Sequence, residues 1–448
     1  MEENKELKNR REQHKRQRQE EVKRTKKKLL CIGAGILVLL VGVGVLTAAV
    51  TSIRHKWEAA HAGMGGAQTA SDAPVQSKVK DISQTAAAEP VDGSSVEAVT
   101  DPRQDGVLHI VAVGDNVMHE KVYESADTSR TVWNYDHLYE NIREDIQAAD
   151  LASVNEECVL VADHKDVSGY PAFGAPSETG DALVNAGFNV VTMATNHVYD
   201  KGEEGILQSV DYWETNHPET ILLGIHKDQE DARTIRTIEL EGITIAMLDY
   251  TCLINGGKQS EIPSGMVDYA NKVKMMADVQ QARFVADLVI VYLHAGTEYE
   301  EQPDEEQKEL LAMLLDEGVD ITICSHPHVL QGFETLQNDA GKQMLVYYSL
   351  GNFMSSQKSP QCLLGGMADI KITKNQQTGE LSIKDSQLIP LVTHYNYEEN
   401  IYTVYRLDQY TEELAASHSV HEESDEEFTL SSLKAMAEKA IHASYAIE

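Results

Sequence analysis

From residue 107 onward, short apolar runs alternate with longer amphipathic ones. The short runs are rich in Val, Ile, Leu or aromatic residues, which is typical of strands, and they cover 107–113, 151–154, 189–193, 220–223, 234–240, 244–248, 288–293, 321–324 and 344–348. The stretches that show a helical apolar period are 137–149, 178–186, 204–216, 271–286 and 305–317. This alternation predicts an α/β fold with mainly parallel strands, whereas 234–248 and 366–387 are typical of antiparallel ribbons.

The apolar pattern also predicts where the folded domain ends. We expect the sheet to end at 381–388, with 391–394 returning toward it, and place the domain at 107–398. Residues 399–448 form an acidic C-terminal extension, whose last amphipathic segment, 429–445, predicts a terminal helix.

One long apolar run precedes the folded domain. Leu29–Val50 contains no ionisable group except the Cys31 thiol, and at ~1.5 Å per residue it spans roughly 33 Å, close to the thickness of a bilayer core. The tail at 1–28 is basic, so the positive-inside rule predicts a cytoplasmic N-terminus and a single transmembrane anchor at 29–53. A cleaved signal peptide and a buried core helix remain alternatives.

Composition separates the anchor from the next segment of the chain. Residues 54–106 are poor in aromatic residues and rich in small and polar ones, which predicts a flexible stalk. The formal net charge of −34 argues against a general nucleic-acid partner, because phosphate binding needs cations. We therefore expect the main domain to be extracellular and the cell membrane to be a partner. Cys158 and Cys324 lie in or beside apolar runs and are interpreted as buried thiols.

Polar residues that can bind metal ions cluster directly after the predicted strands. These runs are Gly114–His119 (GDNVMH), Asn155–Glu157 (NEE), Thr195–Gly202 (TNHVYDKG), His294–Tyr299 (HAGTEY) and Ser325–Gln331 (SHPHVLQ). Singly, each has an ordinary structural interpretation, such as turn chemistry or a helix cap at Asp200. Together they indicate a metal site, because open α/β sheets place their sites at the carboxyl ends of strands. Carboxylate, amide and imidazole ligands without thiolate suit Mn, Fe or Zn, and one carboxylate can bridge two ions.

The ordered set of these runs, together with Tyr348–Phe353 (YSLGNF), resembles the CapA-type poly-γ-glutamate capsule biosynthesis proteins. This family belongs to the calcineurin-like metallophosphoesterase superfamily, and the resemblance covers about 107–395. It implies a four-layer α/β/β/α sandwich, here preceded by the single transmembrane helix, with the site at one edge of the two sheets.

The resemblance also implies a role for individual residues. The implied ligands of a centre with two divalent ions are Asp115, Glu157, Asn196, His294, His326 and His328. His197 matches the acid that faces the leaving group, and Asp200 is a candidate carboxylate to orient it. His119 is a further candidate ligand, although its spacing from Asp115 is longer than in ordinary phosphoesterases.

The implied function is that of a membrane-anchored exterior protein in the synthesis, export or attachment of a poly-γ-glutamate capsule. Its metal site would act as a hydrolase or transferase, and its implied partners are poly-γ-glutamate and membrane-bound polymer synthase subunits. A general cell-surface metallophosphoesterase and a non-catalytic scaffold for polymer export are the alternatives.

Overall fold

The computed structural model describes residues 106–126 and 133–445, which fall within one compact unit, 97–448. The predicted tail (1–28), the predicted anchor (29–53) and all but the last residue of the predicted stalk (54–106) lie outside the described residues. Within the described ranges, no helix is both long enough and apolar enough to cross a bilayer.

The larger of two main sheets combines parallel and antiparallel strands. Its order is β16 (Ile401–Arg406), β15 (Leu381–Asn396), β14 (Leu364–Lys374), β1 (Val107–Asn116), β2 (Leu151–Glu156), β5 (Val190–Thr192) and β6 (Ile221–Leu223), with β13 (Asn352–Met354) paired to the end of β1. Strands β1, β2, β5 and β6 run parallel, and β14, β15 and β16 continue the sheet antiparallel. The carboxyl ends of β1 and β2 therefore lie side by side.

The smaller sheet is built mainly from parallel strands with an antiparallel strand at each edge. Its order is β11 (Phe333–Gln337), β12 (Gln343–Tyr347), β10 (Ile321–Ser325), β9 (Leu288–His294), β8 (Ile243–Thr251) and β7 (Arg236–Leu240). A short pair, β3 (Leu160–Val161) and β4 (Ala175–Pro176), lies outside both sheets. Each predicted strand run overlaps an observed strand, and both predicted antiparallel ribbons are confirmed.

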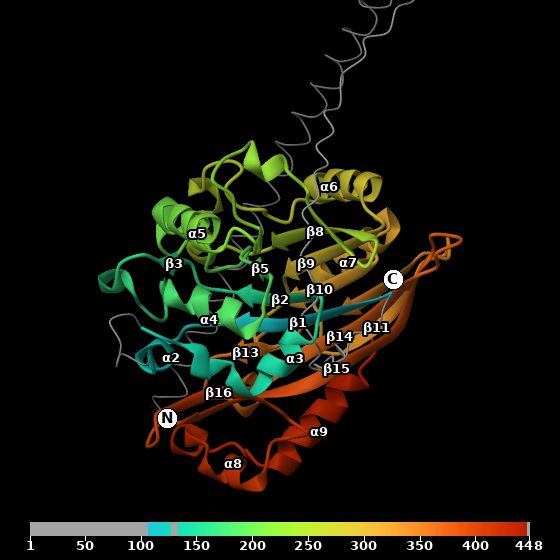
Figure 1. Cartoon of the computed structure of the whole chain (residues 1–448). Helices are drawn as coiled ribbons and strands as arrows, with labels where there is room; N and C mark the ends of the chain where they lie inside the picture. Colours follow the sequence, from blue (N-terminus) through green and yellow to red (C-terminus); the bar gives the residue numbers. More distant parts are fainter. Residues whose placement is uncertain (1–105, 127–132, 446–448) are drawn as a thin grey trace, which may run out of the picture. The chain divides into compact units, whose positions relative to one another are not determined.

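The two sheets pack face to face, as alternation along β9 shows. Ile290 and Tyr292 join the core shared with the larger sheet, whereas Val289, Val291 and Leu293 pack with α6 (Lys272–Val285) and α7 (Glu305–Glu317). Helices α3 (Arg143–Gln147), α4 (Glu178–Ala186) and α5 (Gly202–Asn216) contribute to the core of the larger sheet (Figure 1). The result is a mixed α/β sandwich. Cys158, Cys252, Cys324 and Cys362 are buried free thiols, which confirms the interpretation of Cys158 and Cys324.

One predicted helix is wrong in detail. The stretch 137–149 contains two short 3-10 turns, Asp136–Leu138 and Glu140–Ile142, before α3 begins at Arg143. Leu138, Tyr139 and Ile142 are buried at the spacing of one helix face, so the apolar period holds and only the backbone hydrogen-bond pattern differs from the prediction.

The predicted end of the sheet is also wrong. β15 is one continuous strand through Pro390, whose carbonyl accepts a hydrogen bond from the Leu407 N–H. β16 then pairs with β15, so the sheet continues past the boundary predicted at 398. Two helices follow, α8 (Glu412–Ser417) and the predicted terminal helix, α9 (Leu430–Ile441), which begins with a capping box at Thr429 (Figure 1).

Candidate metal centre

The candidate ligands come together where the strands of both sheets end. Asp115 lies at the end of β1, Glu157 directly follows β2, and His294 is the last residue of β9. His326 and His328 follow β10. The parallel pairing of β1 with β2 and of β9 with β10 brings these ends together, as the sequence pattern predicts.

Asp115, Glu157 and His328 form the first group of ligand atoms. One ligand-type atom from each lies within 4.8 Å of the others, and all three side chains are buried. His328 Nδ1 lies 3.1 Å from Asp115 Oδ2, and His328 Nε2 lies 3.7 Å from Glu157 Oε1. Asn155 Nδ2 donates a hydrogen bond to Asp115 Oδ1 at 2.8 Å, which fixes the orientation of this carboxylate.

Glu157 is the most unusual residue of the group. Its side chain is 1% exposed, and neither carboxylate oxygen has a hydrogen-bond partner among the described residues. Burial raises the pKa of Glu157 well above its usual range, and the nearby His328 opposes this shift. A buried carboxylate with two unpartnered oxygens is costly unless a cation satisfies it, so this residue fits a bound metal ion.

Asn196, His294 and His326 form the second group. His294 Nε2 lies 2.9 Å from Asn196 Oδ1 and 3.1 Å from His326 Nδ1, so three ligand-type atoms converge. The other nitrogen of His294, Nδ1, contacts Ser325 Oγ at 2.9 Å, which orients the ring. The His326 N–H lies 3.4 Å from Asp115 Oδ2, so the two groups adjoin.

The His326–Pro327–His328 segment has an uncommon backbone. His326 has φ 100° and His328 has φ 59°, both in the left-handed region that non-glycine residues seldom adopt. Asn352 Oδ1, on β13, lies 3.0 Å from His328 Nδ1 and helps to fix this ring. Such strain persists only where the surroundings enforce it, and here it directs the His328 imidazole at the carboxylates and the His326 imidazole at His294.

The electrostatics of the three imidazoles differ. Burial, together with the neighbouring imidazoles, lowers the pKa of His294 well below its usual range and that of His326 to about 4. Both are therefore neutral at pH 7, which is the form that binds metals. Burial also disfavours the charged form of His328, but Glu157 and Asp115 outweigh it and raise the pKa to about 10. The carboxylates thus attract positive charge to this point.

His197 and Asp200 form a separate pair next to the second group. His197 Nδ1 lies 2.6 Å from Asp200 Oδ2, which also accepts a hydrogen bond from the Phe173 N–H at 2.8 Å. Asp200 thus fixes the ring of His197 and assigns the Nδ1 proton to the bond between them. The Phe173 ring packs edge-on against His197, with centroids 4.7 Å apart. The geometry suits His197 Nε2 for proton transfer.

His119 lies near both groups but outside the first. Its Nδ1 faces the Ser356 N–H at 3.4 Å, and its ring meets Phe173 edge-on, with centroids 5.3 Å apart. Burial, together with the nearby His328 and His197, lowers the pKa of His119 to about 4. Its role as a ligand stays a prediction.

The structure adds residues that the motifs did not single out. Phe173 belongs to the loop before β4, where no sequence signal marks it. Asn255 follows β8 and contacts both ring nitrogens of His197, at 3.2 and 3.3 Å. The strand-end rule does not find Asn255 directly, because it lies four residues after β8 ends and Asp249 is the polar residue that follows the predicted run 244–248. The predicted ligands carry the donor types that Mn, Fe and Zn use, and they fit a divalent metal.

Comparison with solved structures finds proteins of low sequence identity and low TM-score. A phosphatase from Mycoplasma pneumoniae is 15% identical, covers 64% of this chain and 95% of its own, and has a TM-score of 0.39. The calcineurin-like phosphoesterase YfkN from Bacillus subtilis is 11% identical, covers 75% of this chain and 97% of its own, and has a TM-score of 0.33.

Comparison with curated proteins gives two relatives that carry capsule or PGA biosynthesis in their names. Capsule biosynthesis protein CapA from Bacillus anthracis is 29% identical over 264 residues, which are 57% of this chain and 61% of that protein. PGA biosynthesis protein CapA from Bacillus subtilis (strain 168) is 25% identical over 255 residues, 56% of this chain and 64% of that protein. The match spans less than two thirds of either relative.

The family model described as bacterial capsule synthesis protein PGA_cap matches residues 109–357, more than half of this chain. The matched region contains every ligand candidate of the metal centre, and it agrees with the CapA-type resemblance of the sequence motifs. The chain belongs to the bacterial capsule synthesis protein PGA_cap family.

Proposed function

We propose that this protein is a metal-dependent hydrolase or transferase that acts in the synthesis, export or attachment of a poly-γ-glutamate capsule. The observation that carries the proposal is the buried Glu157 carboxylate, whose two unpartnered oxygens lie beside Asp115 and His328. A scaffold without a metal would gain nothing from this arrangement, because an unpaired buried carboxylate destabilises the fold.

The chemistry divides between the ligands and the His197–Asp200 pair. Asp115, Glu157, Asn196, His294, His326 and His328 would hold two divalent ions, which would supply Lewis-acid polarisation of a phosphoryl or amide carbonyl oxygen. His197, oriented by Asp200, would donate a proton from Nε2 to the leaving group. Because His197 is 6% exposed, little bulk water competes for that proton.

We also propose that the protein is anchored in the cell membrane by a single span, with its N-terminus in the cytoplasm. The support is the uncharged run Leu29–Val50 directly after the basic tail. The extracellular domain would then meet its polymer and any membrane-bound synthase subunits at the cell surface.

The test compares two neighbouring glutamates by substitution with the isosteric amide. Glu157→Gln removes the unpartnered carboxylate. The variant should contain no Mn²⁺ or Zn²⁺ by elemental analysis, and its melting temperature should not rise when metal is added. Glu156→Gln is the matched control, because Glu156 is equally buried but accepts hydrogen bonds from Asn116 Nδ2 and the Cys158 N–H. Full metal occupancy in Glu157→Gln would contradict the proposal.

A further inference from the structure

Tyr299 is an exposed aromatic residue at the edge of the metal centre, and the proposed function gives it no role. Its side chain is 47% exposed, and its ring centroid lies 6.0 Å from that of His328. Tyr299 has φ 66°, in the left-handed region, and its N–H donates a hydrogen bond to the Pro327 carbonyl at 2.8 Å. An exposed tyrosine held in a strained backbone beside a metal ligand suggests a function.

Several ionisable residues surround the phenol group of Tyr299. Burial is the main cause that raises the pKa of Tyr299 to about 12, with smaller contributions from Glu298, Cys362, Tyr170 and Glu157. Tyr170 is itself 77% exposed. The phenol thus lies within electrostatic range of the unpartnered carboxylate, while the ring remains open to solvent.

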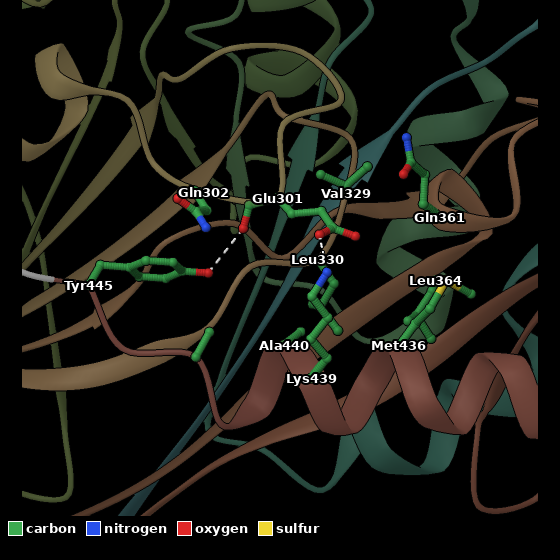
Figure 2. A pocket seen from close by; sticks show the side chains of 11 residues that line it. Glu301, Gln302, Val329, Leu330, Gln361, Leu364, Met436, Lys439, Ala440 and Tyr445 are labelled. Carbon is green, nitrogen blue, oxygen red and sulfur yellow. Dashed lines mark hydrogen bonds and ion pairs between the residues drawn. The ribbon is translucent and has the colours of Figure 1, made fainter.

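The loop that carries Tyr299 is tied to the C-terminal segment, residues 430–445. Tyr445 Oη donates a hydrogen bond to the Glu301 carbonyl at 3.0 Å, and Lys439 Nζ forms an ion pair with the Glu301 carboxylate (Figure 2). Gln331 Nε2 adds a hydrogen bond to the Glu300 carbonyl at 2.9 Å.

The C-terminal segment also packs on the stretch that directly follows His328. Tyr445 Oη accepts a hydrogen bond from the Gly332 N–H at 3.4 Å. A Cβ atom on Gly332 would lie only 2.8 Å from the carbonyl oxygens of Ala440 and Ala443, so this close approach requires glycine. Val329 and Leu330 line the same small pocket as Ala440 (Figure 2). One segment therefore supports both the ligand stretch and the Tyr299 loop.

We propose that Tyr299 is a substrate-contacting residue of the metal centre and that the C-terminal segment, through Glu301, is the positioning element that holds it there. The proposal rests on the proposed function. It adds that Tyr299 contacts the substrate group next to the scissile bond. A tyrosine is suited to this, because it offers a large apolar face and a hydroxyl at little cost in side-chain entropy. The segment lies beyond residue 357, where the family match ends.

The first test uses bis(p-nitrophenyl) phosphate as a probe of the Mn²⁺-loaded protein. Tyr299→Ala should raise the KM about tenfold while kcat and metal content are kept, because it removes a binding contact and no ligand. Tyr299→Phe, which retains the ring, should restore most of the affinity. If the wild-type protein does not turn the probe over, its dissociation constant, measured by calorimetry, replaces the KM. An unchanged constant in Tyr299→Ala, or loss of its metal, overturns the assignment.

The second test isolates the positioning contact. Tyr445→Phe keeps the ring packing on Tyr348, where the centroids are 4.8 Å apart, but removes the hydroxyl that bonds Glu301 and Gly332. Amide hydrogen exchange should become faster in residues 297–304, and the KM or dissociation constant should rise about threefold. Tyr347→Phe is the matched control, because it loses one similar bond, to the Gln387 carbonyl at 2.9 Å, in another part of the fold.

The two readouts separate the inference from the proposed function. Loop exchange that is the same in Tyr445→Phe and Tyr347→Phe overturns the positioning role, whether or not the protein is an enzyme. A wild-type protein without metal contradicts the proposed function instead, and the exchange comparison still decides the role of the C-terminal segment.

Discussion

The protein buries two groups of histidines, and they differ in what their ring nitrogens face. In the metal centre, His294 Nε2 faces His326 Nδ1 at 3.1 Å, and His328 faces the carboxylates of Asp115 and Glu157. In the C-terminal part, the rings of His394 and His418 lie 5.1 Å apart between β15 and the segment that follows α8.

The C-terminal pair has ordinary hydrogen-bond partners. His418 Nδ1 accepts from the Val420 N–H at 2.9 Å, and its Nε2 donates to the Thr393 carbonyl at 3.2 Å. His394 Nδ1 pairs with Tyr410 Oη at 2.7 Å. These imidazoles need no ion and connect two segments of the fold.

The difference shows how a ligand is told from a core histidine. Burial and clustering are common to both groups, so neither property identifies a site. Of the two groups, only the metal centre contains a buried carboxylate whose two oxygens lack partners, at Glu157, together with imidazole nitrogens that face each other. A buried carboxylate with two unsatisfied oxygens inside a cluster of ligand-type atoms, rather than histidine content, indicates where a cation binds.

The largest expected effect comes from substituting one histidine in each group. His328→Ala should weaken Mn²⁺ or Zn²⁺ binding by more than the roughly 10- to 100-fold that loss of an outer hydrogen-bond partner costs, and activity should be lost with the metal. His418→Phe should keep the metal but lose about 1–3 kcal/mol of unfolding free energy, because the buried Val420 N–H loses its acceptor. Elemental analysis and urea unfolding measure the two effects.

Either of two results would break the comparison. Full metal occupancy in His328→Ala would mean that His328 is a structural residue like His418. Loss of metal in His418→Phe at unchanged stability would mean that the C-terminal group also contributes to the centre.

The next largest effect concerns His197. It tests whether the proton donor of the site is distinct from the metal ligands. His197→Ala should keep the metal content and melting temperature nearly intact but reduce any hydrolytic rate by roughly 10²–10⁴-fold, the range for loss of a general acid. His226→Ala is the matched control, because His226 pairs with Asp268 at 2.8 Å in the same way but lies outside the ligand set. If His197→Ala loses its metal, His197 is a ligand and the acid must be another residue.

The sequence was most informative where strand ends carry the chemistry. Asp115, Glu157, His294, His326 and His328 each lie at or just after a short apolar run, and parallel pairing brings such ends together. Local pattern is sufficient there, because the topology of parallel strands leaves their carboxyl ends at one edge.

The sequence was least informative where long-range packing decides. The helical period of 137–149 did not reveal that Tyr139 donates a hydrogen bond to Asn116 Oδ1 and is buried in a 3-10 connection. Phe173 reaches His197 from a loop without any periodic signal. The contact of Tyr445 with Glu301 joins residues 144 positions apart, and no local rule identifies such a pair.

The smallest expected effect is a pH dependence of stability that belongs to the C-terminal histidines. Burial lowers the pKa of His394 to about 4 and, with His394 and His421 nearby, that of His418 to about 3. In the unfolded chain both titrate near 6.5, so between these values the unfolded state binds more protons than the folded state. Their contribution to stability is therefore present above pH 6.5 and is lost progressively as the pH falls toward 4.

The measurement compares the unfolding free energy in urea of the chelator-treated wild type and His418→Phe at pH 7 and pH 5. The wild type should lose about 1–2 kcal/mol more than the variant over this interval, because only the wild type has a proton acceptor at position 418 that is released on unfolding. The variant is the control for the other groups that titrate on unfolding over this interval, His394 among them. Parallel pH profiles would show that His418 is protonated in the folded protein. His418 would then not be a neutral core histidine, and the comparison with His328 would be wrong.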